Sequence, residues 1–306
     1  MSILLTGSTG FVGKSLASTY NVHRHVVRKG EQHDYASIFT VNSINSDTKW
    51  DGAFEGVDVV IHLAGLAHSS NFSDEEYESV NAQGAICLAK AAVMNGVKRF
   101  VFVSSIGVNG TSTSSSPFNE NSPLCPHNSY ARSKYNAEVG LKKIANETEL
   151  EVVIVRPTLV YGLNAPGNFG MLTKLVNKSP FLPFGLVNNR RDFIAVQNLT
   201  DLLVTCARHP DASGHTFLAS DIETVSVKEF TDAIAEGLGK KVIQLPIPTS
   251  LMRFAGKLTG KSAMVEQLLG NLEVSSSNVK DVLGWVPPVT MKQAMASLCL
   301  RDIRVK

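Results

Sequence analysis

The feature that most constrains the fold is a glycine-rich run near the N-terminus, Thr6-Gly7-Ser8-Thr9-Gly10-Phe11-Val12-Gly13. It follows the apolar residues 3–6, which have the pattern of a buried strand, and it opens a helical pattern. Gly7 permits a turn that a side chain would strain, Gly10 lets a pyrophosphate approach the backbone, and Gly13 lets the helix pack on the strand. Free N–H groups at the helix N-terminus would hold the phosphates. The run therefore predicts a strand–turn–helix unit that binds a dinucleotide.

The first half of the chain repeats this alternation of short apolar runs and helical patterns. Several runs are apolar on both faces, as expected for strands of a parallel sheet covered by helices. We therefore predict an α/β fold with a Rossmann-type doubly wound parallel sheet. The predicted strands are residues 3–6, 25–28, 57–63, 99–104 and 150–156, and the predicted helices are residues 10–19, 75–95 and 129–147.

The pattern changes after Pro157, where residues 163–185 are rich in Gly, Pro and Asn. We predict a dinucleotide-binding domain over residues 1–157. Residues 158–306 would form a smaller C-terminal α/β part that mainly binds substrate, with some segments returning to the main sheet. In this part we expect helices at residues 196–207 and 227–237, and strands at residues 215–219 and 242–246.

Composition argues against several classes of partner. The net charge of 306 residues is only +2, so neither nucleic acid nor an anionic membrane is expected. The four cysteines are scattered without a CxxC pair, as in a reduced cytoplasmic protein. Met1 runs almost directly into a strand pattern, which leaves no room for a cleavable signal, and no apolar run has transmembrane length. The spacing of His62 and His68 suits no metal-ligand pair, and we predict no metal site.

The residues after the second predicted strand bear on the cofactor. Dinucleotide-binding folds usually carry an acidic ribose ligand about 20 residues after the glycines. Here that position holds Arg28-Lys29. Because a guanidinium suits a 2′-phosphate, Arg28 favours NADP(H) over NAD(H). The alternative is that Arg28-Lys29 forms a solvated basic turn that does not contact the cofactor.

A second constellation predicts hydride chemistry. Tyr130 and Lys134 lie four residues apart, hence on one face of a predicted helix. A free phenol titrates at about pH 10, and both an adjacent ammonium and an oxidised nicotinamide would favour the phenolate. Ser104-Ser105 ends a predicted strand, and ligands bind at the carboxyl ends of such strands. We predict that Ser105, Tyr130 and Lys134 act together on an alcohol carbon.

These motifs, in order along nearly the whole chain, resemble the extended short-chain dehydrogenases/reductases of the nucleotide-sugar NAD-dependent epimerase/dehydratase family. Those that match are TGSTGFVG, His62-Leu63-Ala64-Gly65, Val80-Asn81, Ser104–Gly110, Tyr130–Lys134, Val155-Arg156-Pro157 and Leu283-Gly284-Trp285-x-Pro287. The resemblance implies that Ser105 is the active-site hydroxyl, Tyr130 the acid/base and Lys134 the ribose-binding partner. It also implies a possible homodimer through the helix of Tyr130, and cofactor contacts from Gly7, Gly10, Phe11, Val12, Gly13, Leu63, Ala64, Asn81, Tyr130, Lys134 and Pro157.

The substrate implied by the resemblance is a nucleotide-diphosphosugar, with UDP as the expected nucleotide. Asn168 matches the family's substrate-loop Asn, and Arg191 matches its diphosphate-binding Arg, which can pair with phosphate bidentately. A loop-capping role for Asn168 and a surface turn at Arg190-Arg191 are the alternatives.

Departures from the family pattern bear on the reaction. Ile106-Gly107 stands where dehydratases carry an Asp-Glu pair, so 4,6-dehydration lacks its acid and base. Asn109 replaces the Tyr, and Leu159 the Asn, that are usual in 4-epimerases. The chain looks most like a polysaccharide-locus subgroup that reduces 4-keto UDP-sugars to UDP-N-acetyl-6-deoxyhexosamines. We therefore predict 4-keto-reduction with NAD(P)H. A UDP-glucose or UDP-N-acetylglucosamine 4-epimerase is the first alternative, and a non-catalytic dinucleotide sensor is the second.

Overall fold

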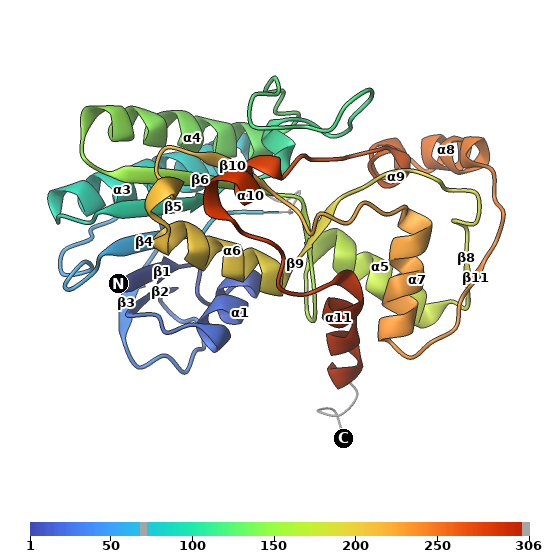
Figure 1. Ribbon diagram of the computed structural model, residues 1–306, viewed down its shortest axis with the longest axis horizontal. Helices are drawn as coiled ribbons and strands as arrows, with labels where there is room; N and C mark the ends of the chain where they lie inside the picture. The colour runs from blue at the N-terminus through green and yellow to red at the C-terminus, as the bar shows by residue number, and fades with distance from the viewer. Residues whose placement is uncertain (68–71, 302–306) are drawn as a thin grey trace.

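A parallel sheet of seven strands forms the frame of the protein in a computed structural model that describes residues 1–67 and 72–301 (Figure 1). The strand order is β10-β6-β5-β4-β1-β2-β3, and every neighbouring pair is parallel. The order reverses between β1 and β4, which creates a crevice for ligands at their carboxyl ends. The strands are β1 (Ile3–Thr6), β2 (Arg24–Arg28), β3 (Ile38–Val41), β4 (Val59–His62), β5 (Arg99–Val103), β6 (Glu151–Pro157) and β10 (Thr216–Ala219).

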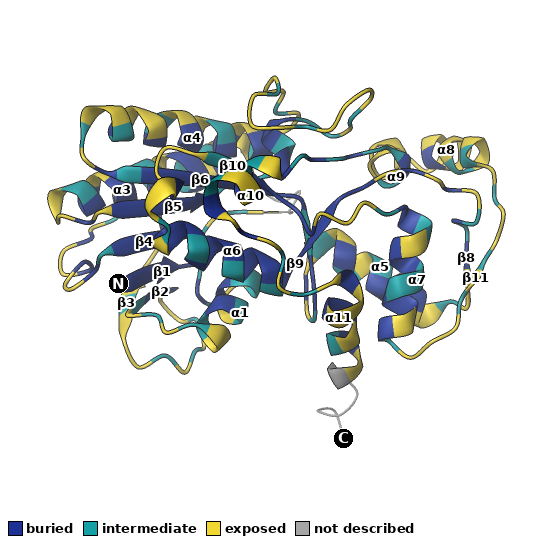
Figure 2. Cartoon of the chain, viewed as in Figure 1, coloured by how far each residue is buried: buried dark blue, intermediate teal, exposed yellow. Residues whose placement is uncertain are grey.

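Helices cover both faces of this sheet (Figure 1). One face packs on η1 (Glu78–Gln83), α3 (Gly84–Met94) and α4 (Ser129–Glu147), and the other on α1 (Phe11–Thr19), α6 (Val196–Arg208) and α10 (Ser277–Leu283). On α4 the buried Ala137, Leu141 and Ile144 follow helical spacing and so form one apolar stripe. The sheet is dark blue between two half-exposed helical layers in Figure 2. The predicted doubly wound α/β fold is confirmed.

A smaller C-terminal lobe lies at one end of the sheet (Figure 1). Its core gathers aromatic side chains, among them Phe169, Phe193 and Phe230, with the last two stacked at 3.8 Å between ring centroids. The lobe contains two small parallel pairs, β7 (Leu159–Tyr161) with β9 (Phe193–Ala195) and β8 (Phe181–Leu182) with β11 (Ile243–Gln244). Its helices are α5 (Gly167–Lys178), α7 (Val227–Gly237), α8 (Thr249–Leu258), α9 (Ser262–Leu269) and α11 (Met291–Ala296). The remaining short helices are α2 (Asp74–Tyr77), η2 (Ile106–Val108), η3 (Pro210–Ala212) and η4 (Ser297–Arg301).

Most predicted elements of the main sheet and its helices are present, and β1, α4 and α7 have the predicted bounds. The helix predicted over residues 75–95 is divided into α2, the π-helix η1 and α3. The prediction omitted β3, an edge strand whose residues are mostly exposed or half-buried. β10 adds to the main sheet although it follows residue 157, so the boundary between residues 157 and 158 stays a prediction. None of the helices in the described ranges has the length and apolar character needed to span a membrane.

Candidate active site

The glycine loop between β1 and α1 has the geometry of a phosphate cradle. Gly7 has φ +71°, and a Cβ there would lie 2.8 Å from the backbone nitrogen of Ala64. A Cβ on Gly13 would lie 2.1 Å from the carbonyl oxygen of Gly7, so both positions require glycine. Gly10, which has no side chain to cap the helix, is the N-cap of α1. The helix begins with Phe11 and Val12, which are both half-buried. The helix N-terminus therefore fits a pyrophosphate.

The loop after β4 forms the facing wall of this cradle. Leu63 and Ala64 lie against Gly7. The fully buried Asn81, on the π-helix η1, accepts a hydrogen bond from Leu66 N at 2.7 Å and donates to Leu66 O at 3.0 Å. It also donates to Ser133 Oγ at 3.0 Å, on the helix of Tyr130. Asn81 thus holds the loop of the predicted cofactor site against α4, and π-helical segments recur at functional sites.

The three predicted catalytic residues meet at the carboxyl end of β5. Ser105 is the N-cap of η2, and its Oγ accepts a hydrogen bond from Gly107 N at 3.1 Å. The Ser105 side chain is also hydrogen-bonded to Tyr130. The buried Lys134 donates from Nζ to the carbonyl oxygen of Val103 at 2.9 Å, and Nζ lies 4.7 Å from the centre of the Phe102 ring. Pro157, at the end of β6, belongs to the neighbouring strand.

Burial governs the protonation of these groups. It raises the pKa of Tyr130 to about 12, although the hydrogen bond with Ser105 acts in the opposite direction. Burial lowers the pKa of Lys134 to about 8, against the attraction of the Glu138 carboxylate. It also lowers the pKa of His62 to about 3, with a further contribution from the Lys134 charge. At neutral pH, Tyr130 therefore holds its proton and can donate it, while Lys134 keeps its charge by a narrow margin.

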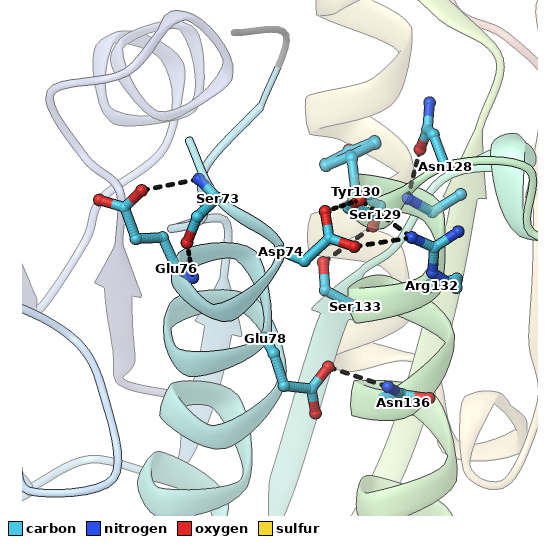
Figure 3. A network of polar contacts seen from close by, with 11 residues as sticks. Ser73, Asp74, Glu76, Glu78, Asn128, Ser129, Tyr130, Arg132, Ser133 and Asn136 are labelled. Carbon is cyan, nitrogen blue, oxygen red and sulfur yellow. Dashed lines mark hydrogen bonds and ion pairs between the residues drawn. The ribbon is translucent and has the colours of Figure 1, made fainter. Parts of the chain in front are cut away.

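A polar network anchors the first turn of the helix that carries Tyr130 (Figure 3). Asn128 caps α4 by accepting from Ala131 N at 2.8 Å. The Asp74 carboxylate on α2 accepts from Ser129 Oγ and, at 3.1 Å, from Arg132 Nη2. Further along, Asn136 donates to Glu78 at 2.8 Å. The contacts of Asp74 and Glu78 with α4 join residues more than fifty positions apart, and the sequence patterns did not indicate them.

Arg28 lies at the end of β2 as predicted, but its guanidinium is paired with a carboxylate. Arg28 Nη2 lies 2.7 Å from Glu31 Oε1, and Thr9 Oγ1 in the glycine loop donates to Glu31 Oε2 at 2.6 Å. Burial tends to raise the pKa of Glu31, but hydrogen bonds from Thr9 and Arg28 outweigh it and lower the pKa. The sequence position of the usual ribose ligand thus holds Arg28, but a carboxylate lies next to it in space, because Glu31 follows the strand by three residues and contacts Thr9 of the glycine loop.

The two predicted substrate residues have different surroundings. Arg191 is 8% exposed, donates from Nη1 to Gly270 O at 2.8 Å, and has its pKa lowered by burial to about 10. Within residues 1–67 and 72–301, no carboxylate forms an ion pair with Arg191, whereas the neighbouring Arg190 pairs with Glu273 at 2.8 Å. Asn168 is exposed on the first turn of α5. Arg191 is thus a buried cation that can pair with an anionic ligand.

Histidine, cysteine and carboxylate side chains form no group of three suited to a metal ion in the described part of the chain. His62 is instead buried in the sheet and shares a hydrogen bond of 2.7 Å with Thr6 Oγ1 through Nδ1. His68 lies outside the described residues.

Comparison with known proteins shows the family of this chain. A model of the NAD dependent epimerase/dehydratase family matches residues 3–219. The chain belongs to this family. It is 41% identical over 303 residues to a UDP-glucose 4-epimerase of Vibrio cholerae, covering 95% of this chain and 92% of the relative. It is 26% identical over 331 residues to a dTDP-4-dehydro-6-deoxyglucose reductase of Escherichia coli, covering 99% and 98%.

A solved structure agrees with the fold. The enzyme WbmG of Bordetella bronchiseptica, in complex with NAD and UDP, is similar with a TM-score of 0.73 and 21% identity, covering 99% of this chain and 94% of that one. The resemblance of the sequence to extended nucleotide-sugar short-chain dehydrogenases/reductases is confirmed, and the chain is an enzyme of an NAD-dependent family.

Proposed function

We propose that this enzyme transfers a hydride between a nicotinamide dinucleotide and C4 of a UDP-linked hexose, and that its net reaction reduces a 4-keto sugar. The observation that carries the proposal is the meeting of Ser105, Tyr130 and Lys134 at the carboxyl end of β5. These groups supply one proton and polarise one oxygen, which is the chemistry that interconversion of a ketone and an alcohol needs.

Each of the three side chains has a distinct task in this reaction. A bound nicotinamide supplies the hydride. Tyr130, which burial keeps protonated, donates its proton to O4 of the sugar. Ser105 directs its hydroxyl to the same oxygen and polarises the carbonyl. Lys134 holds the ribose of the cofactor, and its charge stabilises the phenolate that Tyr130 becomes.

A nucleotide diphosphate fits the charge at Arg191. Among the described residues no carboxylate forms an ion pair with the buried Arg191 guanidinium, which makes its burial costly, and a diphosphate can satisfy it with bidentate hydrogen bonds. We propose that Arg191 binds the diphosphate and that Asn168 contacts it from α5. UDP is the favoured nucleotide because the Vibrio cholerae relative is a UDP-glucose 4-epimerase and WbmG is complexed with UDP.

The residues near Ser105 and at the start of β7 favour reduction over dehydration and epimerisation. Ile106 and Gly107 offer no carboxylate beside Ser105. Asn109 is 2% exposed, with its amide oxygen held by Arg156 at 3.1 Å, and Leu159 presents no hydrogen-bonding side chain to a sugar.

A UDP-hexose 4-epimerase is the second candidate. The 41% identity to such an enzyme and the carboxylate of Glu31, which suits a retained NAD, favour it.

For the cofactor, the ion pair of Arg28 alters the prediction of NADP(H). Glu31 neutralises Arg28 and places a carboxylate beside Thr9 of the phosphate cradle. A 2′-phosphate would meet this negative charge, whereas a ribose 2′-hydroxyl could donate a hydrogen bond to it. We therefore propose that the site prefers NAD(H).

Two assays separate the candidates. Purified enzyme is incubated with UDP-glucose or UDP-N-acetylglucosamine without added cofactor, and separately with a UDP-4-keto-6-deoxyhexose and NADH. Stoichiometric oxidation of NADH with the keto sugar supports the reductase. Interconversion of the C4 epimers without net oxidation supports the epimerase, and turnover in neither assay contradicts both.

A further inference from the structure

A buried ion pair connects the elements that carry Ser105, Tyr130 and Lys134. Glu138 on α4 and Arg156 on β6 are each 1% exposed. Arg156 Nη2 donates to Glu138 Oε2 at 2.5 Å, and Arg156 Nε donates to Glu138 Oε1 at 2.9 Å. Glu138 Oε1 also accepts from Ser104 Oγ at 2.5 Å, and Arg156 Nη1 donates to Asn109 Oδ1 at 3.1 Å. Every contact in this network is buried.

The position of the pair relates it to each catalytic side chain. Glu138 follows Lys134 by one helical turn, so both lie on the same face of α4. Ser104 directly precedes Ser105, and Asn109 ends the short helix η2 that Ser105 begins. The pair therefore joins the helix of Tyr130 and Lys134 to the two ends of the segment that carries Ser105.

Stability alone gives a weak reason for such a pair. Burial of two charges costs several kcal/mol per ion, and apolar replacements of similar volume are often neutral or stabilising. The local charges supply another reason. Around Lys134, the Glu138 carboxylate on α4 attracts the ammonium, Arg156 on β6 is paired with Glu138, and His62 on β4 is neutral at physiological pH. Tyr130, one turn before Lys134, is also neutral there.

We infer that Glu138 and Arg156 are positioning residues, which keep the Lys134 ammonium charged inside the protein and fix the Ser104–Ser105 strand end against α4. Arg156 orients the carboxylate through two hydrogen bonds and so directs its charge. This role rests on the proposed C4 hydride chemistry for its purpose, but the charge of Lys134 can be measured without any substrate.

The test is a titration of Lys134 in the free enzyme. Lysines are labelled with ¹³C at the ε-carbon, and the Lys134 signal is assigned by its absence in Lys134→Arg. In Glu138→Gln, which keeps the side-chain shape, the pKa of Lys134 should fall by about one unit or more, as expected for loss of a nearby opposite charge. The alkaline limb of the kcat profile should move by the same amount. Glu147→Gln, which removes an exposed carboxylate from the same helix, should change neither.

An unchanged Lys134 titration in Glu138→Gln would overturn the inference, even if activity fell. Should that variant not fold, Glu138→Met with Arg156→Met removes the whole pair while retaining volume. Lys134 should still titrate lower in this double variant, and wild-type titration there contradicts the inference. A wild-type enzyme that fails at C4 chemistry, with Lys134 still responding to Glu138, would refute the proposed function alone.

Discussion

Glu31 gives the sharpest prediction about cofactor choice. Glu31→Gln removes a carboxylate that Thr9 and Arg28 both contact, and it retains the shape of the side chain. Arg28 then loses its ion pair at the edge of the phosphate cradle. We expect the variant to bind NADPH better and NADH worse than the wild-type enzyme.

The contacts set the size of this effect. A hydrogen bond from a ribose hydroxyl to a carboxylate is worth about 1.5 kcal/mol or more, and NADH loses most of it. The gain for NADPH is smaller, about 1 kcal/mol, because Arg28 is 64% exposed and solvent screens its charge. Together these terms change the ratio of the two dissociation constants by about 10-fold to 100-fold.

The assay is a titration of NADH and NADPH fluorescence on the same protein preparations, without substrate. Glu55→Gln is a matched control, since it removes the exposed carboxylate of another ion pair, with Arg24 at 3.5 Å. Adding Arg28→Ala to Glu31→Gln should remove the gain for NADPH. If Glu31→Gln leaves the ratio of the NADH and NADPH dissociation constants unchanged, Glu31 does not bind the ribose hydroxyl and the reasoning is refuted.

Three further predictions concern the catalytic and substrate residues. Tyr130→Phe should lower kcat by about 10²-fold to 10⁴-fold, as expected for loss of a positioned acid, and leave the Kd of NADH unchanged by fluorescence; unaltered turnover would contradict its role. Arg191→Met should weaken UDP binding by about 10-fold to 100-fold in calorimetry without lowering Tm, because it removes a buried cation that forms no ion pair with any carboxylate of the described residues. The folded-state pKa of Lys134, about 8, lies below its usual 10.5, so the unfolded chain binds more protons between these pH values. The free energy of unfolding should therefore rise by about 3 kcal/mol more across this window in wild type than in Lys134→Met; equal slopes in denaturant titrations would disprove it.

The parts of the site that were predictable are those set by local sequence. The glycine loop was predictable because Gly7 and Gly13 lie against backbone atoms, where a side chain would clash. These atoms belong to the same loop and to the residues that follow the adjacent strand β4. Tyr130 and Lys134 share a helical face by their spacing, and Ser105 follows a strand whose apolar residues identify it. In each case a short segment carries both the structure and the chemistry.

The parts that were not predictable depend on how distant segments meet. Glu31 reaches Thr9 only because β1 and β2 pair in parallel and the chain after β2 turns back over the glycine loop. Glu138 and Arg156 are 18 residues apart on a helix and on a strand of the sheet it covers. The helical spacing of Glu138 from Lys134 was a usable signal, but its partner required the register of β6 beside β5.

The central claim is that a hydride passes to C4 of a UDP-linked keto sugar, with Tyr130 supplying the proton. Its most direct test is a single turnover of a UDP-4-keto-6-deoxyhexose with NADH that carries deuterium at the transferable position, followed by mass spectrometry and NMR of the sugar. We predict one deuterium bound to C4 of the product, with no deuterium at C5 or C6. A product without deuterium at C4, or a keto sugar that stays unreduced while wild-type enzyme binds both ligands, would contradict the claim.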